Sequence, residues 1–281
     1  MALYLRPTEV DEAVAALAAN DALTILAGGT DFYPARVGHP AARAPDVLDI
    51  TALRGLRGIT DDGGRLRIGA ATTWSDIVRS DLPPWFDGLK RAAREVGGVQ
   101  IQNAGTIAGN LCNASPAADG VPCLLALDAA VELASRSGRR SVPLDAFITG
   151  VRRTARRPDE LVTAILVPTP RRPAQATFLK LGARRYLVIS IAMVGAVIET
   201  DGDRVTAARI AVGACSPVAR RLPALEAALA GRPLSPALGE VPEPAHLAPL
   251  SPIDDPRGTA GYRADAALTL VRRALRELAA Q

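Results

Sequence analysis

A run of small and polar residues in the first half of the chain has the composition of a loop that holds an anionic ligand. The run covers Asn103 to Asn110 and continues to Asp119. Its glycines and alanines leave the backbone uncovered, so main-chain N–H groups can approach phosphate oxygens, and its short side chains add further hydrogen-bonding groups. Because such runs also make ordinary tight turns, the stretch alone does not decide between a turn and a ligand loop.

A second glycine-rich stretch lies near the start of the chain. It covers Ala27 to Asp31 and follows a short apolar run, Leu23 to Ala27, that predicts a strand. A strand followed by a glycine loop suggests dinucleotide binding, but neither the GxGxxG fingerprint nor the P-loop pattern is present. The known nucleotide motifs therefore do not explain this stretch.

The cysteines and histidines do not form a metal site. Cys112, Cys123 and Cys215 make no CxxC pair, which argues against a zinc or iron-sulfur centre on this chain. Cys112 and Cys123 are expected to be small buried residues. His39 and His246 lie far apart in the sequence and have no neighbouring cysteine or glutamate. We assign no metal, and any such centre must lie on a partner.

The composition predicts a globular protein that does not bind nucleic acid. The chain has 281 residues, 48% of them hydrophobic, which is enough for substantial cores. The net charge is only +4 and aromatic residues make up 4%, so neither a basic patch nor a base-stacking platform is indicated. The start, Met1 to Glu12, lacks the layout of a signal peptide, and no run approaches the ~18 apolar residues of a membrane span. We expect a cytoplasmic protein.

The basic residues are almost all arginines. Of 33 Lys and Arg residues only Lys90 and Lys180 are lysines. In such an arginine-rich chain, pairs such as Arg152 and Arg153, or Arg156 and Arg157, are expected to be solvated surface. A lysine in this background is a stronger candidate for a specific role.

Alternating and helical patterns predict a mixed α and β chain with a boundary near three prolines, Pro168, Pro170 and Pro173. A helix is expected to begin at Thr8, acting as cap, and another to run from Trp85 to Val96. After the boundary come three predicted strands and a long amphipathic helix. These are Thr177 to Leu181, Ile189 to Glu199, Val205 to Gly213, and Thr259 to Ala280.

Several ordered motifs, spread over almost the whole length, resemble the FAD-binding medium subunit of the molybdenum hydroxylases. This is the family of xanthine dehydrogenase and aerobic carbon monoxide dehydrogenase. The motifs are Ala27 to Asp31, Arg65 to Thr73, Thr106 to Asn110 with Ser115, Pro116 and Asp119, Pro158 to Ile165, Phe178 to Gly182 with Ile189 and Ser190, and Asp255 to Arg263.

The resemblance implies an α+β fold in two domains. Residues 1–170 would form a PCMH-type FAD-binding domain built of two α/β subdomains. Residues 174–281 would form a C-terminal domain of the CO dehydrogenase flavoprotein type, with a three-stranded antiparallel sheet and helices.

The resemblance also implies which residues contact FAD. The first FAD loop would contain Ile25, Leu26, Ala27, Gly28, Gly29, Thr30, Asp31 and Phe32, and the second would contain Thr106, Ile107, Ala108, Gly109 and Asn110. Ser115 and Asp119 would follow the second loop, with Asp119 holding a hydroxyl-rich part of the cofactor, and Val96 and Val162 would make apolar contacts. Lys180 would face the cofactor from the second domain, where its ammonium can pair with a phosphate or the reduced flavin.

Two of these residues also have plain structural interpretations. Taken alone, Lys180 is an exposed strand lysine, and Asp119 is the N-cap of a helix that starts near Val121. A third residue departs from the family pattern: Ala108 stands where the second loop usually has a glycine. If its φ is positive, the methyl group costs about 1 kcal/mol or more, and if its φ is negative, the alanine is harmless.

By resemblance, the chain is an FAD-binding oxidoreductase subunit that relays electrons within a heterotrimer. Its partners would be a small subunit with 2Fe-2S clusters and a large molybdopterin subunit, and its acceptor would be NAD+, a quinone or O2. Two alternatives remain open at this point: a stand-alone flavoprotein without molybdenum partners, and a degenerate scaffold that keeps the fold without FAD.

Overall fold

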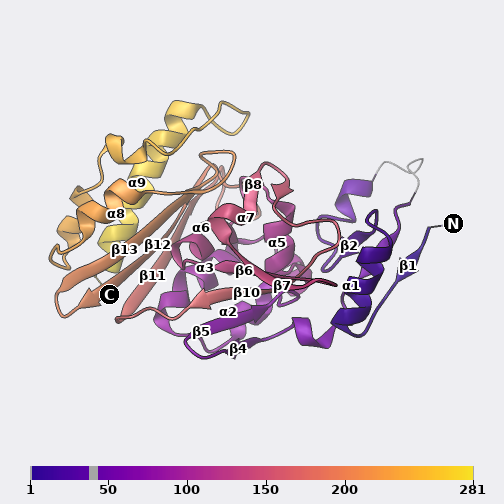
Figure 1. The fold of residues 1–281 in the computed structure, drawn as a ribbon. Coiled ribbons are helices and arrows are strands. Elements are labelled where there is room, and N and C mark those ends of the chain that lie inside the picture. Colours follow the sequence, from indigo (N-terminus) through magenta and orange to yellow (C-terminus); the bar gives the residue numbers. More distant parts are fainter. Residues whose placement is uncertain (1, 38–43, 281) are drawn as a thin grey trace.

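Three sheets follow one another along the molecule in this computed structural model, which describes residues 2–37 and 44–280. Figure 1 shows the N-terminal elements at one end and the C-terminal elements at the other, with a five-stranded sheet and its helices between them. The architecture is the mixed α+β class predicted from the sequence. No helix among the described residues is long and apolar enough to cross a bilayer.

The N-terminal sheet is small and parallel, with the strand order β1-β3-β2. It consists of β1 (Tyr4–Leu5), β2 (Thr24–Leu26) and β3 (Val47–Asp49), and α1 (Val10–Ala19) connects the first two strands. The helix begins after Glu9, whose side chain forms a capping box with Glu12, so the predicted cap at Thr8 was wrong by one residue. α1 buries Val14 and Leu17 against this unit.

The middle sheet is antiparallel and has the strand order β4-β5-β10-β6-β7. Its strands are β4 (Ile59–Asp61), β5 (Arg65–Gly69), β6 (Ala130–Ser135), β7 (Gly138–Pro143) and β10 (Leu161–Pro168). β10 is buried along all but its last residue, as expected for a central strand with an apolar sequence. A two-stranded hairpin of β8 (Ile148–Gly150) and β9 (Arg153–Thr154) lies beyond the short helix α7 (Leu144–Phe147).

Five helices lie between the strands of the middle part of the chain. They are α2 (Trp74–Arg79), α3 (Asp87–Glu95), α4 (Val99–Ala104), α5 (Ile107–Asn113) and α6 (Gly120–Ala126). Five short 3-10 turns, η1 (Pro34–Arg36), η2 (Arg54–Leu56), η3 (Pro84–Phe86), η4 (Pro236–Glu240) and η5 (Pro244–Leu247), complete the helical elements. The helix predicted from Trp85 to Val96 is thus the 3-10 turn η3 followed by α3.

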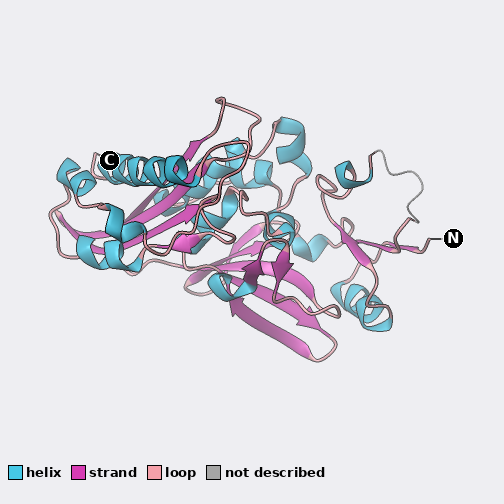
Figure 2. Ribbon diagram, turned by 90° about the horizontal axis from the view of Figure 1, so that it is seen from above, coloured by secondary structure: helices cyan, strands magenta, loops and turns pink. Residues whose placement is uncertain are grey.

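The C-terminal sheet contains the three predicted long antiparallel strands and one short addition. Its strands are β11 (Ala174–Leu181), β12 (Ala192–Asp201), β13 (Arg204–Gly213) and β14 (Arg220–Arg221), in that order. Two residues of β14 pair with β13, so the sheet has four strands rather than three. α8 (Pro223–Leu229) and α9 (Ala260–Leu278) pack on this sheet, with α9 lying along one face (Figure 2).

The largest hydrophobic core joins the middle part of the chain to the C-terminal sheet. Phe178, Met193 and Val197 of that sheet belong to the same buried cluster as the helices α3 and α6. At Gly195 the strand comes so close to α6 that an added Cβ would lie 2.7 Å from the backbone nitrogen of Cys123. This core fixes the second half of the chain beside α3 and α6, the helices that lie before and after the small-residue run.

Candidate functional site

A cavity of about 740 Å³ lies between the first glycine-rich stretch, the start of α5 and the strand β10. Most of the residues named from the resemblance line it: Ile25, Leu26, Ala27, Gly28, Gly29, Thr30, Asp31, Phe32, Val96, Thr106, Ala108, Gly109, Asn110 and Val162. Ile107, Ser115, Asp119 and Lys180 do not line it. The volume is within the range of small-molecule and cofactor sites.

The first glycine-rich stretch offers its backbone to the cavity. Gly29 has a φ of +72°, which favours glycine, and an added Cβ at Gly28 would lie 1.8 Å from the carbonyl oxygen of Ala104. The backbone N–H groups from Gly28 to Phe32 have no hydrogen-bond partner among the described residues. Consecutive free N–H groups beside a positive φ are the arrangement that binds anions.

The small-residue run from Asn103 to Asp119 is mainly helical, not a loop. α4 ends at Ala104, and α5 begins after Thr106, whose hydroxyl accepts a hydrogen bond from the N–H of Gly109 at 3.1 Å. The N–H of Ile107 donates to the carbonyl of Thr72 at 3.0 Å. The N–H groups of Ile107 and Gly109 are therefore already used by a neighbouring turn and by the helix cap. Thr106, Ala108, Gly109 and Asn110 still line the cavity.

Ala108 occupies a helical position in the first turn of α5. Ala108 is not one of the described non-glycine residues with a positive φ. Its side chain is 5% exposed and belongs to the main core. The alanine therefore carries no backbone strain, and the departure from the family's glycine is harmless to the local conformation.

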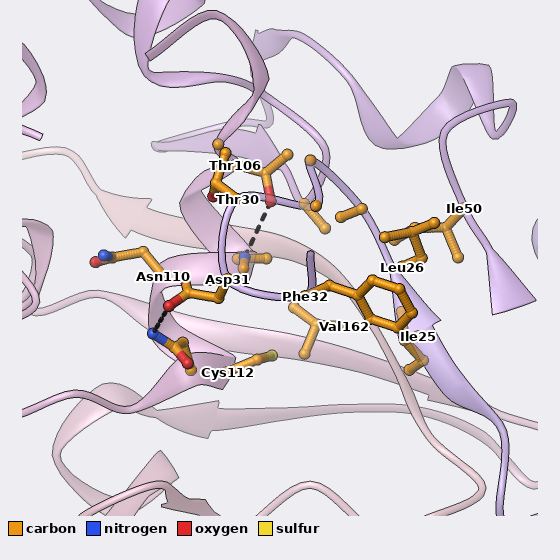
Figure 3. Close-up of a pocket in the computed structure, with 18 of the residues that line it drawn as sticks. Ile25, Leu26, Thr30, Asp31, Phe32, Ile50, Thr106, Asn110, Cys112 and Val162 are labelled. Atoms are coloured by element: carbon orange, nitrogen blue, oxygen red, sulfur yellow. Dashed lines mark hydrogen bonds between the residues drawn. The ribbon is translucent and has the colours of Figure 1, made fainter. Parts of the chain in front are cut away.

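The cavity has a polar end and an apolar end. Figure 3 shows Ile25, Leu26, Ile50 and Phe32 on one side of the view, and Thr106, Asn110 and Asp31 on the other. The buried Oδ1 of Asn110 has no hydrogen-bond partner. This atom is closed off from solvent, so it is not among the groups that the cavity offers to a ligand.

Asp119 and Lys180 form a buried ion pair beside this cavity. The Nζ of Lys180 donates to Oδ2 of Asp119 at 2.8 Å, and Ser190 donates its hydroxyl to Oδ1 at 2.6 Å. The side chains of Lys180 and Asp119 are 6% and 9% exposed. Burial raises the pKa of Asp119, and the ammonium of Lys180 opposes that rise.

One plain interpretation was wrong and the other was confirmed in part. Lys180 is not exposed. Asp119 does occupy the N-cap position of α6, but its side chain makes no cap hydrogen bond. Lys180 also donates to the carbonyl oxygen of Glu95 at 3.3 Å, one residue before the cavity residue Val96. The pair is therefore next to the cavity wall rather than in it.

Ser115 and Ile107 have local roles. The hydroxyl of Ser115 accepts a hydrogen bond from the N–H of Ala117 at 3.3 Å, which stabilises the turn before α6. Ile107 is fully buried in the core beneath the cavity.

Several cavity residues were not predicted from the sequence. Asn113, Arg152 and Arg156 line the cavity. Arg152 is exposed as expected, with 58% of its side chain accessible, but it also has a place in the cavity wall. Cys112 also lines it and is exposed rather than buried. No local pattern marks these residues, because the two arginines come to the cavity from about 40 residues further along the chain than α5, Arg152 in the β8–β9 turn and Arg156 just after β9.

The residues considered for metal binding do not come together in the described part of the chain. No cluster of three or more His, Cys, Asp or Glu side chains with metal-site geometry occurs among residues 2–37 and 44–280. The Nδ1 of His246 accepts a hydrogen bond from the backbone of Glu243 at 3.0 Å. His39 lies outside the described residues.

Known proteins match the chain over nearly its full length. A family model described as the FAD binding domain in molybdopterin dehydrogenase matches residues 1–170, and one described as the CO dehydrogenase flavoprotein C-terminal domain matches residues 177–278. The nicotine 6-hydroxylase medium subunit of Paenarthrobacter nicotinovorans is 31% identical over 99% of this chain and 97% of its own length. The xanthine dehydrogenase FAD-binding subunit of Escherichia coli O157:H7 is 30% identical over 99% of this chain and 96% of its own length.

A solved structure agrees with these sequence matches. The carbon monoxide dehydrogenase of Hydrogenophaga pseudoflava contains a chain that superposes with a TM-score of 0.87 at 31% identity, covering 99% of this chain and 97% of that one.

Proposed function

We propose a specific role for this chain from the premise that it belongs to the FAD-binding medium subunits of the molybdenum hydroxylase family. Members of this family are flavoprotein subunits of oxidoreductases, and their cofactor is FAD. Our proposal is that the cavity beside the first glycine-rich stretch holds that FAD. In this role the chain relays electrons between the iron-sulfur clusters of a partner subunit and an external acceptor.

The free N–H groups of the first glycine-rich stretch carry the proposal. Gly28 to Phe32 line a cavity of cofactor size, and their N–H groups have no partner in the described chain. A diphosphate supplies the acceptor oxygens that such donors require.

Other residues would hold the remaining parts of the cofactor. The apolar walls at Ile25, Leu26, Val96 and Val162 suit flat ring systems. The buried pair of Asp119 and Lys180 adjoins Val96 through the carbonyl of Glu95. We assign this pair to the cofactor's edge, with the charge of Lys180 balanced by Asp119.

The relay needs no strong acid or base on this chain. FAD takes up electrons singly or in pairs, which suits a junction between one-electron clusters and a two-electron acceptor. The chain's residues need only bind the cofactor, set its surroundings and leave it accessible. We propose a small 2Fe-2S subunit and a large molybdopterin subunit as partners, and NAD+, a quinone or O2 as acceptor.

Two further assignments belong to this proposal. We place the boundary between the FAD-binding domain and the C-terminal domain in residues 170–174, after the proline cluster that follows β10. A cytoplasmic location stays a prediction.

Purification of the chain tests the proposal. We expect a yellow protein with a flavin absorbance spectrum and about one FAD per chain, and we expect iron-sulfur and molybdopterin proteins to co-purify from the native host. Colourless protein that takes up no added FAD would contradict the binding site. Steady oxidation of NAD(P)H by the isolated flavoprotein, without partner chains, would favour the stand-alone alternative over the relay.

A further inference from the structure

Three side chains from distant parts of the sequence meet at the cavity and form a connected group. Asp31 belongs to the first glycine-rich stretch, Asn113 is the last residue of α5, and Arg152 lies in the turn between β8 and β9. All three line the cavity. We call them the Asp31–Asn113–Arg152 group.

The amide of Asn113 connects the two charged members of the group. Its Nδ2 donates to Oδ1 of Asp31 at 3.0 Å, an interaction drawn in Figure 3, and its Oδ1 accepts a hydrogen bond from Nη1 of Arg152. The same Nη1 lies 3.3 Å from the backbone carbonyl oxygen of Asn113 and 4.0 Å from Oδ1 of Asp31. The amide nitrogen of Asn113 is thus held by Asp31, and its amide oxygen orients the guanidinium of Arg152.

The backbone also fixes Arg152 in place. Its φ is +57°, a left-handed conformation that arginine rarely adopts. Its N–H donates to the carbonyl oxygen of Ala114 at 2.9 Å, which ties the β8–β9 turn to the end of α5. The unusual conformation therefore coincides with a contact that holds Arg152 at the cavity.

Much of the guanidinium's hydrogen-bonding capacity remains free. Nη1 makes the contacts described above, whereas Nε and Nη2 have no hydrogen-bond partner among residues 2–37 and 44–280. The side chain is 58% exposed, so these donors are accessible. A planar fork of N–H donors matches phosphate oxygens better than a lysine ammonium does.

Arg152 also balances the charge of Asp31. The carboxylate of Asp31 belongs to the same stretch whose free N–H groups face the cavity, and it would repel a diphosphate there. A guanidinium 4.0 Å from that carboxylate offsets its charge. Arg153, the next residue, does not line the cavity and contacts Gly150 of its own hairpin instead.

We propose that Arg152 is a phosphate-binding residue of the FAD site, and that Asn113 and Asp31 are positioning residues that hold its guanidinium. This inference rests on the proposed function, because it takes the cavity to be the FAD site. It adds a side-chain cation to a site that otherwise binds the diphosphate with backbone N–H groups.

The test measures FAD affinity of the apoprotein by fluorescence titration, with Arg153→Ala as the matched control. Arg152→Ala should weaken FAD binding by ~10- to 100-fold, the usual effect of losing a charge-assisted hydrogen bond. Arg152→Gly should do the same, and it keeps the left-handed backbone free of strain, so misfolding cannot explain its loss. The loss should shrink when salt is raised from about 0.05 M to about 0.5 M, because salt screens an exposed charge.

Each outcome decides the proposal. The proposal is supported if both Arg152 variants bind FAD more weakly while Arg153→Ala keeps the wild-type affinity. The apoproteins should then also have similar urea unfolding midpoints. Wild-type FAD affinity in the Arg152 variants overturns the proposal while leaving FAD binding intact. An equal loss of FAD affinity in Arg153→Ala also overturns it, since that loss would report a general effect of the hairpin. A wild-type chain that takes up no FAD would contradict the proposed function itself.

Discussion

The buried ion pair of Asp119 and Lys180 is the residue contact with the largest expected effect on stability. Both side chains are less than 10% exposed, and Ser190 supplies the only other side-chain hydrogen bond to the carboxylate among the described residues. Removing one member leaves the other charge in a poorly solvated place.

Lys180→Met should lower the free energy of unfolding of the apoprotein by ~3–5 kcal/mol, because Asp119 would remain buried without its counter-ion. Arg172→Met is the matched control. Arg172 pairs with Asp201 at 3.3 Å, but both side chains are more than half exposed, so its loss should cost ~1 kcal/mol or less. Urea unfolding measures the free energy of unfolding of both variants. Equal losses of stability would show that the ion pair of Lys180 and Asp119 is not shielded from water.

Asp255 gives a prediction of pH dependence. The backbone N–H of Arg257, and then the guanidinium of Arg263, lower the pKa of Asp255 from 3.8 to about 2. A carboxyl whose pKa is lower in the folded state stabilises the fold at pH values above its pKa in the unfolded chain. This contribution is lost as the pH falls through its pKa in the folded state. Asp255→Asn should therefore be less stable than wild type at pH 5 and above. The difference should close as the pH falls from about 4 to about 2, and a difference that stays constant over this range would contradict the assigned pKa.

The start of helix α5 determines which groups the motif from Thr106 to Asn110 presents to the cavity. Thr106 caps the helix and Ala108 sits in its first turn with ordinary helical backbone. The motif therefore contributes a helix end and a polar side chain, Asn110, whereas the first glycine-rich stretch contributes free N–H groups.

Ala108→Gly restores the residue that the family usually has at this position, and it should not improve FAD binding. It should lower the free energy of unfolding by about 1–2 kcal/mol, because glycine is unfavourable in a helix and a buried methyl group is lost. FAD titration and urea unfolding of the same protein measure both effects. Tighter FAD binding by the glycine variant would mean that the alanine does restrict the site.

The sequence predicted most elements but not the way in which they bring the site together. Local patterns predicted the strand before the first glycine-rich stretch and the three long C-terminal strands, since half-buried and buried strands leave a local pattern. The free N–H groups of the first stretch, the partner of Lys180 and the placement of Arg152 depend on contacts between residues tens of positions apart. Local patterns do not encode such contacts, so resemblance located the cavity while the structure alone identified its polar partners.

At the scale of the whole molecule, the two halves of the chain share a core. Gly195 of β12 lies against α6, with its virtual Cβ 2.7 Å from the nitrogen of Cys123. The ion pair of Asp119 and Lys180 crosses the same boundary. The residues beside the cavity should therefore depend on packing at this boundary.

Gly195→Ala should lower the free energy of unfolding by ~1–3 kcal/mol, because the added methyl group meets backbone atoms that cannot move away. Gly261→Ala in α9 is the control: nothing lies within 4 Å of its added Cβ, and the change should stabilise the protein by ~0.5–1 kcal/mol. We expect thermal or urea unfolding to show opposite changes in stability for the two substitutions. A neutral Gly195→Ala would show that the two halves pack more loosely than described.

Hydrogen exchange with and without FAD tests whether the first glycine-rich stretch binds the cofactor. The N–H groups from Gly28 to Phe32 have no partner in the described chain, so bound FAD should slow their exchange strongly. The N–H groups of Ile107 and Gly109 already have partners and should change less. FAD that binds without protecting residues 28–32 would contradict the account, because the cofactor would then lie outside the first glycine-rich stretch.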